Sequence, residues 1–158
     1  MDHSVTAMSR CRIVQIPHRK VRQLIEGYPR LGAYLWRETM IDSAIFREWL
    51  VNLGARDAHS RMAHLLCELH TRLDAVGLAA DKAVELPITQ TDFADAMGVS
   101  TVHVNRVLQQ LKQEGLVSYS RGSIAIHDLD ALKAVAGFDP AYLHLTEGLP
   151  VAPITIVA

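Results

Sequence analysis

Apolar positions recur at helical spacing over the first half of the chain. They predict three helices, at residues 18–26, 30–53 and 58–76. A glycine follows each predicted end, and Asp57 is a suitable N-cap for the third helix. The first half is therefore expected to be largely helical.

Short β-strands are predicted on both sides of these helices. β-branched residues in partial alternation favour a strand or hairpin at 4–16, and Leu86 to Ile88 read as a short strand. Residues 116–127 predict two strands around Arg121 and Gly122. Residues 78–85 are interpreted as a connector, and the turn-rich tail from Gly148 receives no assigned structure.

Further helices are bounded by strong capping signals. Thr89 with Asp92 three residues later resembles a capping box and opens a helix that ends at Met97. Ser100 caps the next helix, which runs to Glu114, and Asp128 caps a last helix at 129–137. The fold class is therefore expected to be mainly α with a small β component (α+β).

Residues 90–109 meet the requirements of a helix-turn-helix, in which two helices pack steeply across a short turn. Ala94 supplies the small residue at the crossing, and Gly98 supplies a turn residue that tolerates positive φ. Met97 and Val99 flank the turn. The second helix has an apolar stripe for burial, formed by Val104, Val107, Leu108 and Leu111, and Phe93 completes the core.

The opposite face of the second helix carries side chains that suit DNA bases. It presents Thr101, Val102, His103, Asn105, Arg106 and Gln109. Arginine reads guanine, asparagine or glutamine reads adenine, and small apolar groups contact the thymine methyl. Ser100 and Thr101 are candidates for phosphate contacts at the helix start, and Arg121 is a candidate for one at the tip of a wing. Thr89 and Gln90 are further candidate DNA-binding residues. An ordinary solvated helix face and a plain hairpin turn are the alternatives.

Composition narrows the class of protein without pointing to nucleic acid. The chain has 158 residues, of which 49% are hydrophobic, and a formal net charge of −1. Any DNA-binding surface must therefore be local. The two cysteines form no disulfide framework, and no apolar stretch reaches membrane-spanning length, so a cytoplasmic protein without membrane contact is expected.

The stretch LPITQTDFADAMGVSTVHVNRVLQQLKQEGLV, at residues 86–117, resembles the Crp/Fnr family of bacterial transcription regulators. The following SYSRGSIAIHD resembles the family's wing, and the order of elements before it also fits. The resemblance implies a double-stranded DNA partner, with RNA polymerase as a candidate partner. It divides the chain into a remnant of the β-roll sensor domain with the dimerisation helix (1–54), a winged helix-turn-helix domain (55–145) and a tail (146–158).

The same resemblance implies that the helix at 30–53 forms a homodimer, which would read a near-palindromic operator. The expected interface is a stripe formed by Leu31, Leu35, Ile41, Ile45 and Trp49, widened by Trp36, Met40, Phe46 and Leu50. Packing within one subunit is the alternative. Both interpretations account for a helix that is apolar over so much of its circumference.

Two departures from the family pattern change the expectation. Val102 stands where the reading helix commonly carries glutamate, whereas Arg106 keeps the family's arginine, so base preference should differ. Most of the β-roll, including the cassette that holds a nucleotide phosphate, has no counterpart in this sequence. No cofactor is therefore expected. The missing roll also motivates a second hypothesis, an interaction protein that pairs with full-length relatives.

A metal-dependent enzyme is a third hypothesis, based on His64, Cys67 and His70 on one helix. Cys67 lies in an apolar stripe, so a buried core thiol explains it better than a metal ligand does. Cys11 stands alone, and the sequence contains no phosphate-binding loop or nucleophile elbow. The sequence therefore predicts a protein that is not an enzyme and holds no metal.

Overall fold

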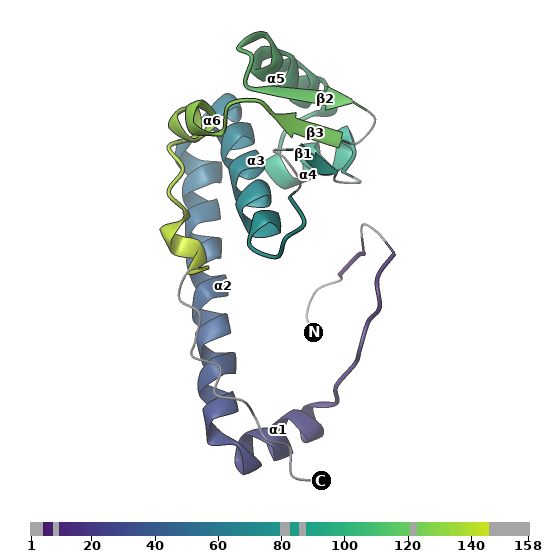
Figure 1. Cartoon of the computed structure of the whole chain (residues 1–158), viewed down its shortest axis with the longest axis vertical. Helices are drawn as coiled ribbons and strands as arrows, with labels where there is room; N and C mark the ends of the chain where they lie inside the picture. Colours follow the sequence, from purple (N-terminus) through teal and green to yellow (C-terminus); the bar gives the residue numbers. More distant parts are fainter. Residues whose placement is uncertain (1–4, 8–9, 80–82, 86–87, 121–122, 146–158) are drawn as a thin grey trace.

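One long helix, α2, runs through most of the molecule (Figure 1). The helix α1 meets one end of α2 at a steep angle, η1 lies beside the middle of α2, and the other helices and the strands lie toward its other end. The computed structural model describes residues 5–7, 10–79, 83–85, 88–120 and 123–145. The elements are α1 (His18–Gly27), α2 (Pro29–Ala55), α3 (Ala58–Asp74), β1 (Ala83–Glu85), α4 (Gln90–Met97), α5 (Thr101–Gln113), β2 (Val117–Ser120), β3 (Ser123–Ile126), α6 (Leu129–Ala136) and the 3₁₀ helix η1 (Pro140–Leu143). Among the described helices, none is long and apolar enough to span a membrane.

The three strands form one antiparallel sheet in the order β1-β3-β2. Val84 is opposite Ile124 in the first pair, and Tyr119 is opposite Ile124 in the second. The sheet lies beside α3, α4 and α5 (Figure 1). This mainly helical fold with a small sheet confirms the predicted fold class.

The hydrophobic core lies where α3, α4, α5, α6 and the sheet meet. Its fully buried side chains include Met62, Phe93, Met97, Val104, Leu111, Ile124 and Leu132. The α3 N-cap is as predicted, because the Asp57 carboxylate accepts a hydrogen bond from Ser60 N at 2.8 Å. This bond lowers the pKa of Asp57.

Three predictions about secondary structure are wrong or incomplete. Residues 5–7 and 10–16 form no strand and are exposed, because no other described strand lies beside them to complete a ladder. The predicted connector at 78–85 contains β1, whereas Ile88 is not in a strand and residues 86–87 lie outside the described part. The 3₁₀ helix η1 was not predicted. The tail, residues 146–158, lies outside the described part as well.

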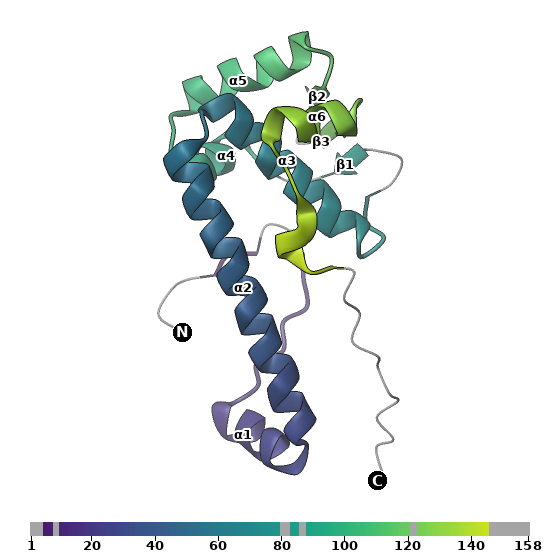
Figure 2. The same cartoon turned by 90° about the vertical axis from the view of Figure 1, so that its left-hand side faces the viewer.

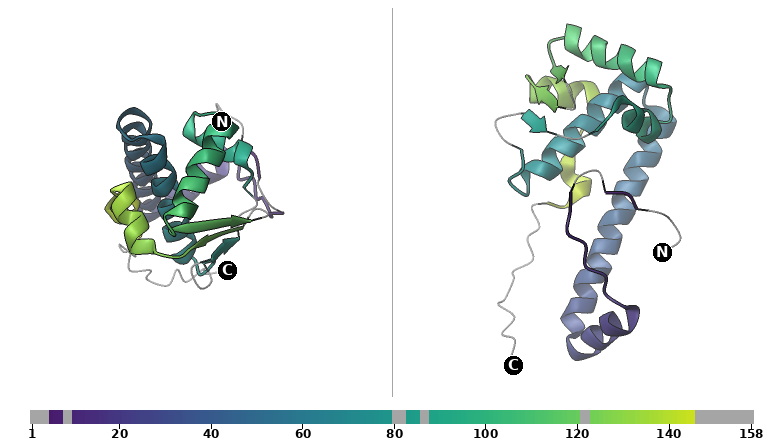
Figure 3. Two further views of the ribbon diagram at one scale, coloured as in Figure 1. Left: turned by 90° about the horizontal axis from the view of Figure 1, so that it is seen from above. Right: turned by 90° about the vertical axis from the view of Figure 1, so that its right-hand side faces the viewer.

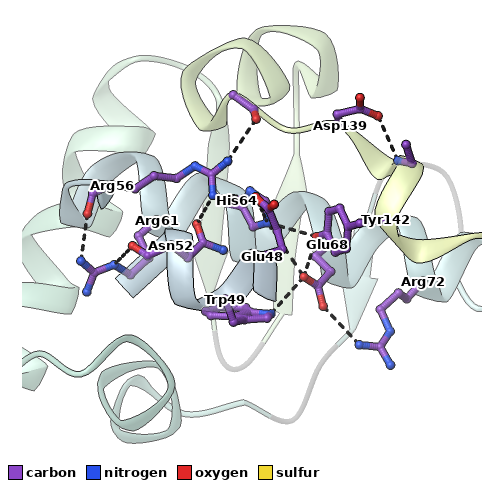
Figure 4. A network of polar contacts seen from close by, with 12 residues as sticks. Glu48, Trp49, Asn52, Arg56, Arg61, His64, Glu68, Arg72, Asp139 and Tyr142 are labelled. Atoms are coloured by element: carbon purple, nitrogen blue, oxygen red, sulfur yellow. Dashed lines mark hydrogen bonds and ion pairs between the residues drawn. The ribbon is translucent and has the colours of Figure 1, made fainter. Parts of the chain in front are cut away.

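A buried polar network joins α2 to α3 (Figure 4). The Glu68 Oε2 atom accepts hydrogen bonds from Trp49 Nε1 at 3.1 Å and from the Tyr142 hydroxyl at 2.7 Å. His64, fully buried, has Nε2 3.1 Å from the Tyr142 oxygen. Since that hydroxyl gives its proton to Glu68, His64 Nε2 is the donor to the oxygen. The buried Nδ1 of His64 has no hydrogen-bond partner among the described residues.

This environment predicts that the stability of the protein falls with acidification. Burial lowers the pKa of His64, and the Arg56 guanidinium acts in the same direction, against Glu48 and Glu68. As the pH falls below about 6.5, His64 is therefore protonated in the unfolded chain before it is protonated in the folded protein. The contribution of neutral His64 is complete above that pH and decreases below it, by up to about 1.4 kcal/mol per pH unit.

Urea unfolding at pH 7.5 and pH 5.5 tests this expectation. His64→Gln keeps a polar side chain and should lose less stability between the two pH values than the parent does. The other histidines contribute equally to both proteins. An equal loss in parent and variant would show that His64 is not the group responsible.

Candidate nucleic-acid interface

The α4–α5 unit has the geometry that its sequence predicts. Ala94 is buried where α4 packs against α5. Gly98 follows α4 with φ 64° and ψ 38°, the left-handed region that glycine adopts without steric cost. The Val99 amide donates to Ala94 O at 3.0 Å, which completes the turn. The chain therefore reverses direction between the two helices within a few residues.

Side-chain caps fix the starting points of both helices. Asp92 N donates to Thr89 Oγ1 at 3.2 Å, and Thr89 N donates to Asp92 Oδ2 at 2.7 Å, so the predicted capping box is present. These bonds lower the pKa of Asp92. Ser100 Oγ accepts from His103 N at 3.3 Å. The first turn of α5 contains no acidic residue. No carboxylate in this turn therefore competes with an anionic ligand for its amide groups and the positive end of the helix dipole.

The two faces of α5 divide as expected from the sequence. Val104, Val107, Leu108 and Leu111 are buried, which confirms the inward stripe. The other face is exposed, and α5 lies along the outer edge of the molecule, at the end remote from α1 (Figures 2 and 3). A surface helix with an exposed polar face in this position can enter a DNA groove without displacing any other described element.

The predicted base-reading side chains gather on that outer face. Thr101, Asn105, Arg106 and Gln109 are exposed, and Val102 is 79% exposed. Arg106 Nη2 lies 3.4 Å and 3.5 Å from the two ring nitrogens of the half-buried His103. Asn105 Nδ2 lies 3.4 Å from Gln90 Oε1 on α4. His103 and Gln90 are therefore placed to orient the two candidate readers.

The β2–β3 hairpin is in the position of a wing beside α5. Tyr119 anchors it, because its hydroxyl donates to Ile88 O at 3.3 Å and its ring packs edge-on against Phe93. Ser120 and Ser123 pair at the last rung before the turn. Arg121, the predicted phosphate contact, lies outside the described residues, so its role stays a prediction.

The expected interface stripe on α2 lies partly against the core of its own subunit. Ile45 and Trp49 pack against the core of their own subunit, and Trp49 also hydrogen-bonds to Glu68. Leu31 and Ile41 are half-buried, and Leu35 is exposed. The predicted stripe is therefore turned partly inward, and its two residues closest to the core are used within one chain.

Another face of α2 has no partner within the part of the chain that the structure describes. Its residues follow alternating three- and four-residue steps, the spacing of a coiled-coil seam: Trp36, Thr39, Ser43, Phe46, Leu50 and Leu53. Phe46 is 72% exposed and Leu50 is 70% exposed. The Thr39 and Ser43 hydroxyls donate to backbone oxygens one turn earlier, so their polar atoms are satisfied within the helix. Trp36, Phe46 and Leu50 belong to the wider apolar surface that the sequence predicted for this helix.

The cluster proposed for a metal is explained by packing. Cys67 is fully buried, and burial raises the pKa of its thiol to about 12. His64 belongs to the polar network between α2 and α3. The described residues contain no group of three side chains arranged to hold a metal ion.

Comparison with known proteins identifies the domain that contains this interface. A family model described as the Crp-like helix-turn-helix domain matches residues 60–135. These residues form a Crp-like helix-turn-helix domain. The match covers most of α3 and α6 and all of β1, α4, α5, β2 and β3, so it includes the helix that carries the exposed polar face.

Relatives of the Crp-like domain and its neighbouring helices include characterised regulators. The nitrogen fixation regulation protein FixK of Azorhizobium caulinodans is 27% identical over 82% of this chain and 53% of its own length. The cAMP-activated global transcriptional regulator CRP of Escherichia coli O157:H7 is 28% identical over 78% of this chain and 58% of its own length. The chain thus spans little more than half the length of these relatives.

Solved structures show the same fold. FixK2 from Bradyrhizobium japonicum superposes with a TM-score of 0.69 at 21% identity, covering 76% of this chain and 59% of FixK2. A CooA mutant from Carboxydothermus hydrogenoformans superposes with a TM-score of 0.64 at 18% identity, covering 75% of this chain and 55% of CooA. These two structures therefore share the fold of most of this chain.

The turn of the helix-turn-helix gives a prediction about stability. Gly98→Ala should lower the free energy of unfolding by about 1–2 kcal/mol, because a Cβ at this positive φ is strained although the surrounding space is open. Gly54→Ala is the matched control, since Gly54 lies in α2 with equally open space and no positive φ. It should be neutral or stabilising by up to about 1 kcal/mol. Urea titration of both variants measures the contrast, and equal effects would contradict the turn geometry.

Proposed function

We propose that the chain is a sequence-specific DNA-binding transcription regulator of the Crp/Fnr type, which inserts α5 into the major groove. The observation that carries this proposal is the exposed polar face of α5, which lies opposite the buried apolar stripe of the same helix. Arg106 and Asn105 have the donors and acceptors that read base edges, and Val102 offers methyl groups to a thymine. The relatives named above support the proposal, because one is named a regulation protein and the other a transcriptional regulator.

The bases read should depend mainly on Arg106, with Asn105 and Thr101 as helpers. Arg106 lies on the exposed face with its guanidinium beside His103, four residues after Val102. Ser100 and the first-turn amides of α5 are placed for a phosphate, which would fix the register of the helix. Because Val102 has no hydrogen-bonding group, its base pair should be discriminated through methyl contact alone.

Arg106→Ala should weaken binding to the preferred site by about 1–3 kcal/mol and relax the preference at one base pair. The preferred site comes first from selection out of random DNA. Fluorescence anisotropy at fixed salt then measures both proteins on all four bases at each position. Arg22→Ala, which removes the same charge from α1 at the far end of the molecule, is the control and should change affinity little. If Arg106→Ala keeps the base preferences of the parent, Arg106 is not a base reader.

We further propose that two copies of this chain pair through the seam on α2. The seam includes the three most exposed large apolar side chains of α2, which are Trp36, Phe46 and Leu50 at 67%, 72% and 70%. A two-fold dimer formed this way would present two α5 helices to a near-palindromic operator, one helical turn apart. RNA polymerase is a further candidate partner of the DNA-bound dimer.

Phe46→Glu should convert the dimer to a monomer, because each copy would bring a carboxylate into an apolar seam. Light scattering coupled to size exclusion reports the mass. Val76→Glu, at another exposed apolar residue after α3, is the control and should remain dimeric. A monomeric parent would contradict the homodimer and favour pairing with a full-length relative.

A further inference from the structure

The Crp-like domain contacts α2 in a second place, in addition to the point where α2 continues into α3. Residues 137–145, here called the C-terminal strap, leave α6 and lie beside α2 (Figure 1). The strap includes η1 and follows the family match at 60–135, so it is an addition to the matched domain. The chain therefore returns from the DNA-binding domain to the long helix.

Two arginine side chains contact the strap at two separate positions along α2. Arg56 Nη2, at the end of α2, lies 3.4 Å from Gly137 O. Arg37 Nη2, five turns earlier on the same helix, lies 3.4 Å from His144 O. The strap therefore runs alongside the part of α2 between these two arginines.

Tyr142 ties the middle of the strap to α3. Its hydroxyl donates to Glu68 Oε2 at 2.7 Å and accepts from His64 Nε2 at 3.1 Å. Trp49 of α2 donates to the same Oε2 atom, so one carboxylate oxygen, on a residue only 4% exposed, receives donors from both α2 and the strap. The Tyr142 ring also stacks on His64 and lies edge-on to Phe138.

The opposite side of the α2–α3 corner is held by Arg61. Its guanidinium donates to Asn52 O, Leu53 O and Arg56 O at the end of α2, and to Met97 O at the end of α4. The corner thus has bonds on both sides: Arg61 near the helix-turn-helix, and the Tyr142–Glu68–Trp49 group farther along α3 (Figure 4). A joint bonded at two separated points resists rotation, whereas one bonded at a single point can pivot.

We propose that the C-terminal strap fixes the angle between α2 and the Crp-like domain, and so sets the half-site spacing that the dimer accepts. Tyr142 is the positioning residue. In a dimer joined through α2, the separation of the two α5 helices depends directly on this angle. The effect on half-site spacing rests on the proposed function, because it requires a DNA-bound dimer. The angle between α2 and the Crp-like domain can be measured within a single chain.

Two tyrosines make a matched pair of variants. Tyr142→Phe removes the hydroxyl that connects the strap to Glu68 and leaves the ring in place. Tyr119→Phe removes a hydroxyl of similar burial whose bond to Ile88 O stays inside the Crp-like domain. Trp49→Phe removes the other donor to Glu68 Oε2, and it replaces Tyr142→Phe as the test variant if that protein does not fold.

The first measurement is the distance distribution between spin labels on α2 and α5. Asp42→Cys and Lys112→Cys, both at exposed positions, take the labels in a Cys11→Ser background. Cys67 stays unlabelled because it is fully buried and its thiol has a pKa of about 12. Dilution with unlabelled protein isolates the distance within one chain. Tyr142→Phe should broaden the distribution, and Tyr119→Phe should leave it as in the parent.

The second measurement compares operators with the selected half-site spacing against operators one base pair shorter or longer. Loss of a hydrogen bond to a carboxylate should reduce the discrimination between them about fivefold or more in Tyr142→Phe, and not in Tyr119→Phe. An unchanged distance distribution, or a broadened one with unchanged discrimination, would overturn the strap proposal. A parent that binds no DNA would instead contradict the proposed function, and the distances would still test the angle.

Discussion

The burial of α3 is the constraint on which the rest of the structure depends. Helices α2, α4, α5 and α6 all contact it, and residues 62–68 are buried around its whole circumference. A helix enclosed on every side must be apolar or must pair each polar group with a partner. Glu68 and the Nε2 atom of His64 follow this rule through Tyr142 and Trp49, whereas His64 Nδ1 has no hydrogen-bond partner among the described residues. The segments that bear Tyr142 and Trp49 therefore have to come together over α3.

The corner between α2 and α3 illustrates how unsatisfied backbone groups shape the domain. The last carbonyls of a helix have no partner within it. Arg61 satisfies three of them at the end of α2 and reaches a fourth oxygen, Met97 O, at the end of α4. One guanidinium therefore connects the end of the long helix with the helix-turn-helix. Its planar set of donors suits several oxygens at once, which lysine could not match.

The helix-turn-helix was predictable from the sequence because its determinants are local. The Thr89–Asp92 capping box, the positive φ of Gly98 and the Ser100 cap each act within four residues. The inward stripe of α5 follows from helical periodicity, and all four of its predicted residues are buried. Once the buried stripe is known, the residues on the opposite side of α5 must form its outer face. The candidate base readers Asn105 and Arg106 are exposed there, as predicted. Their contact with DNA remains a prediction.

The sequence by itself determined which α-helices form, where they begin and end to within two residues, and which face of α5 points inward. The tertiary structure alone decided which face of α2 stays free, because that depends on η1 and α3 packing against Ile45 and Trp49. It also decided the strands: β1 exists because β3 offers it a partner, whereas the β-branched residues near the N-terminus have none among the described strands. Helix signals are carried by near neighbours in the chain, but strand pairing and interfaces depend on residues that only folding brings together.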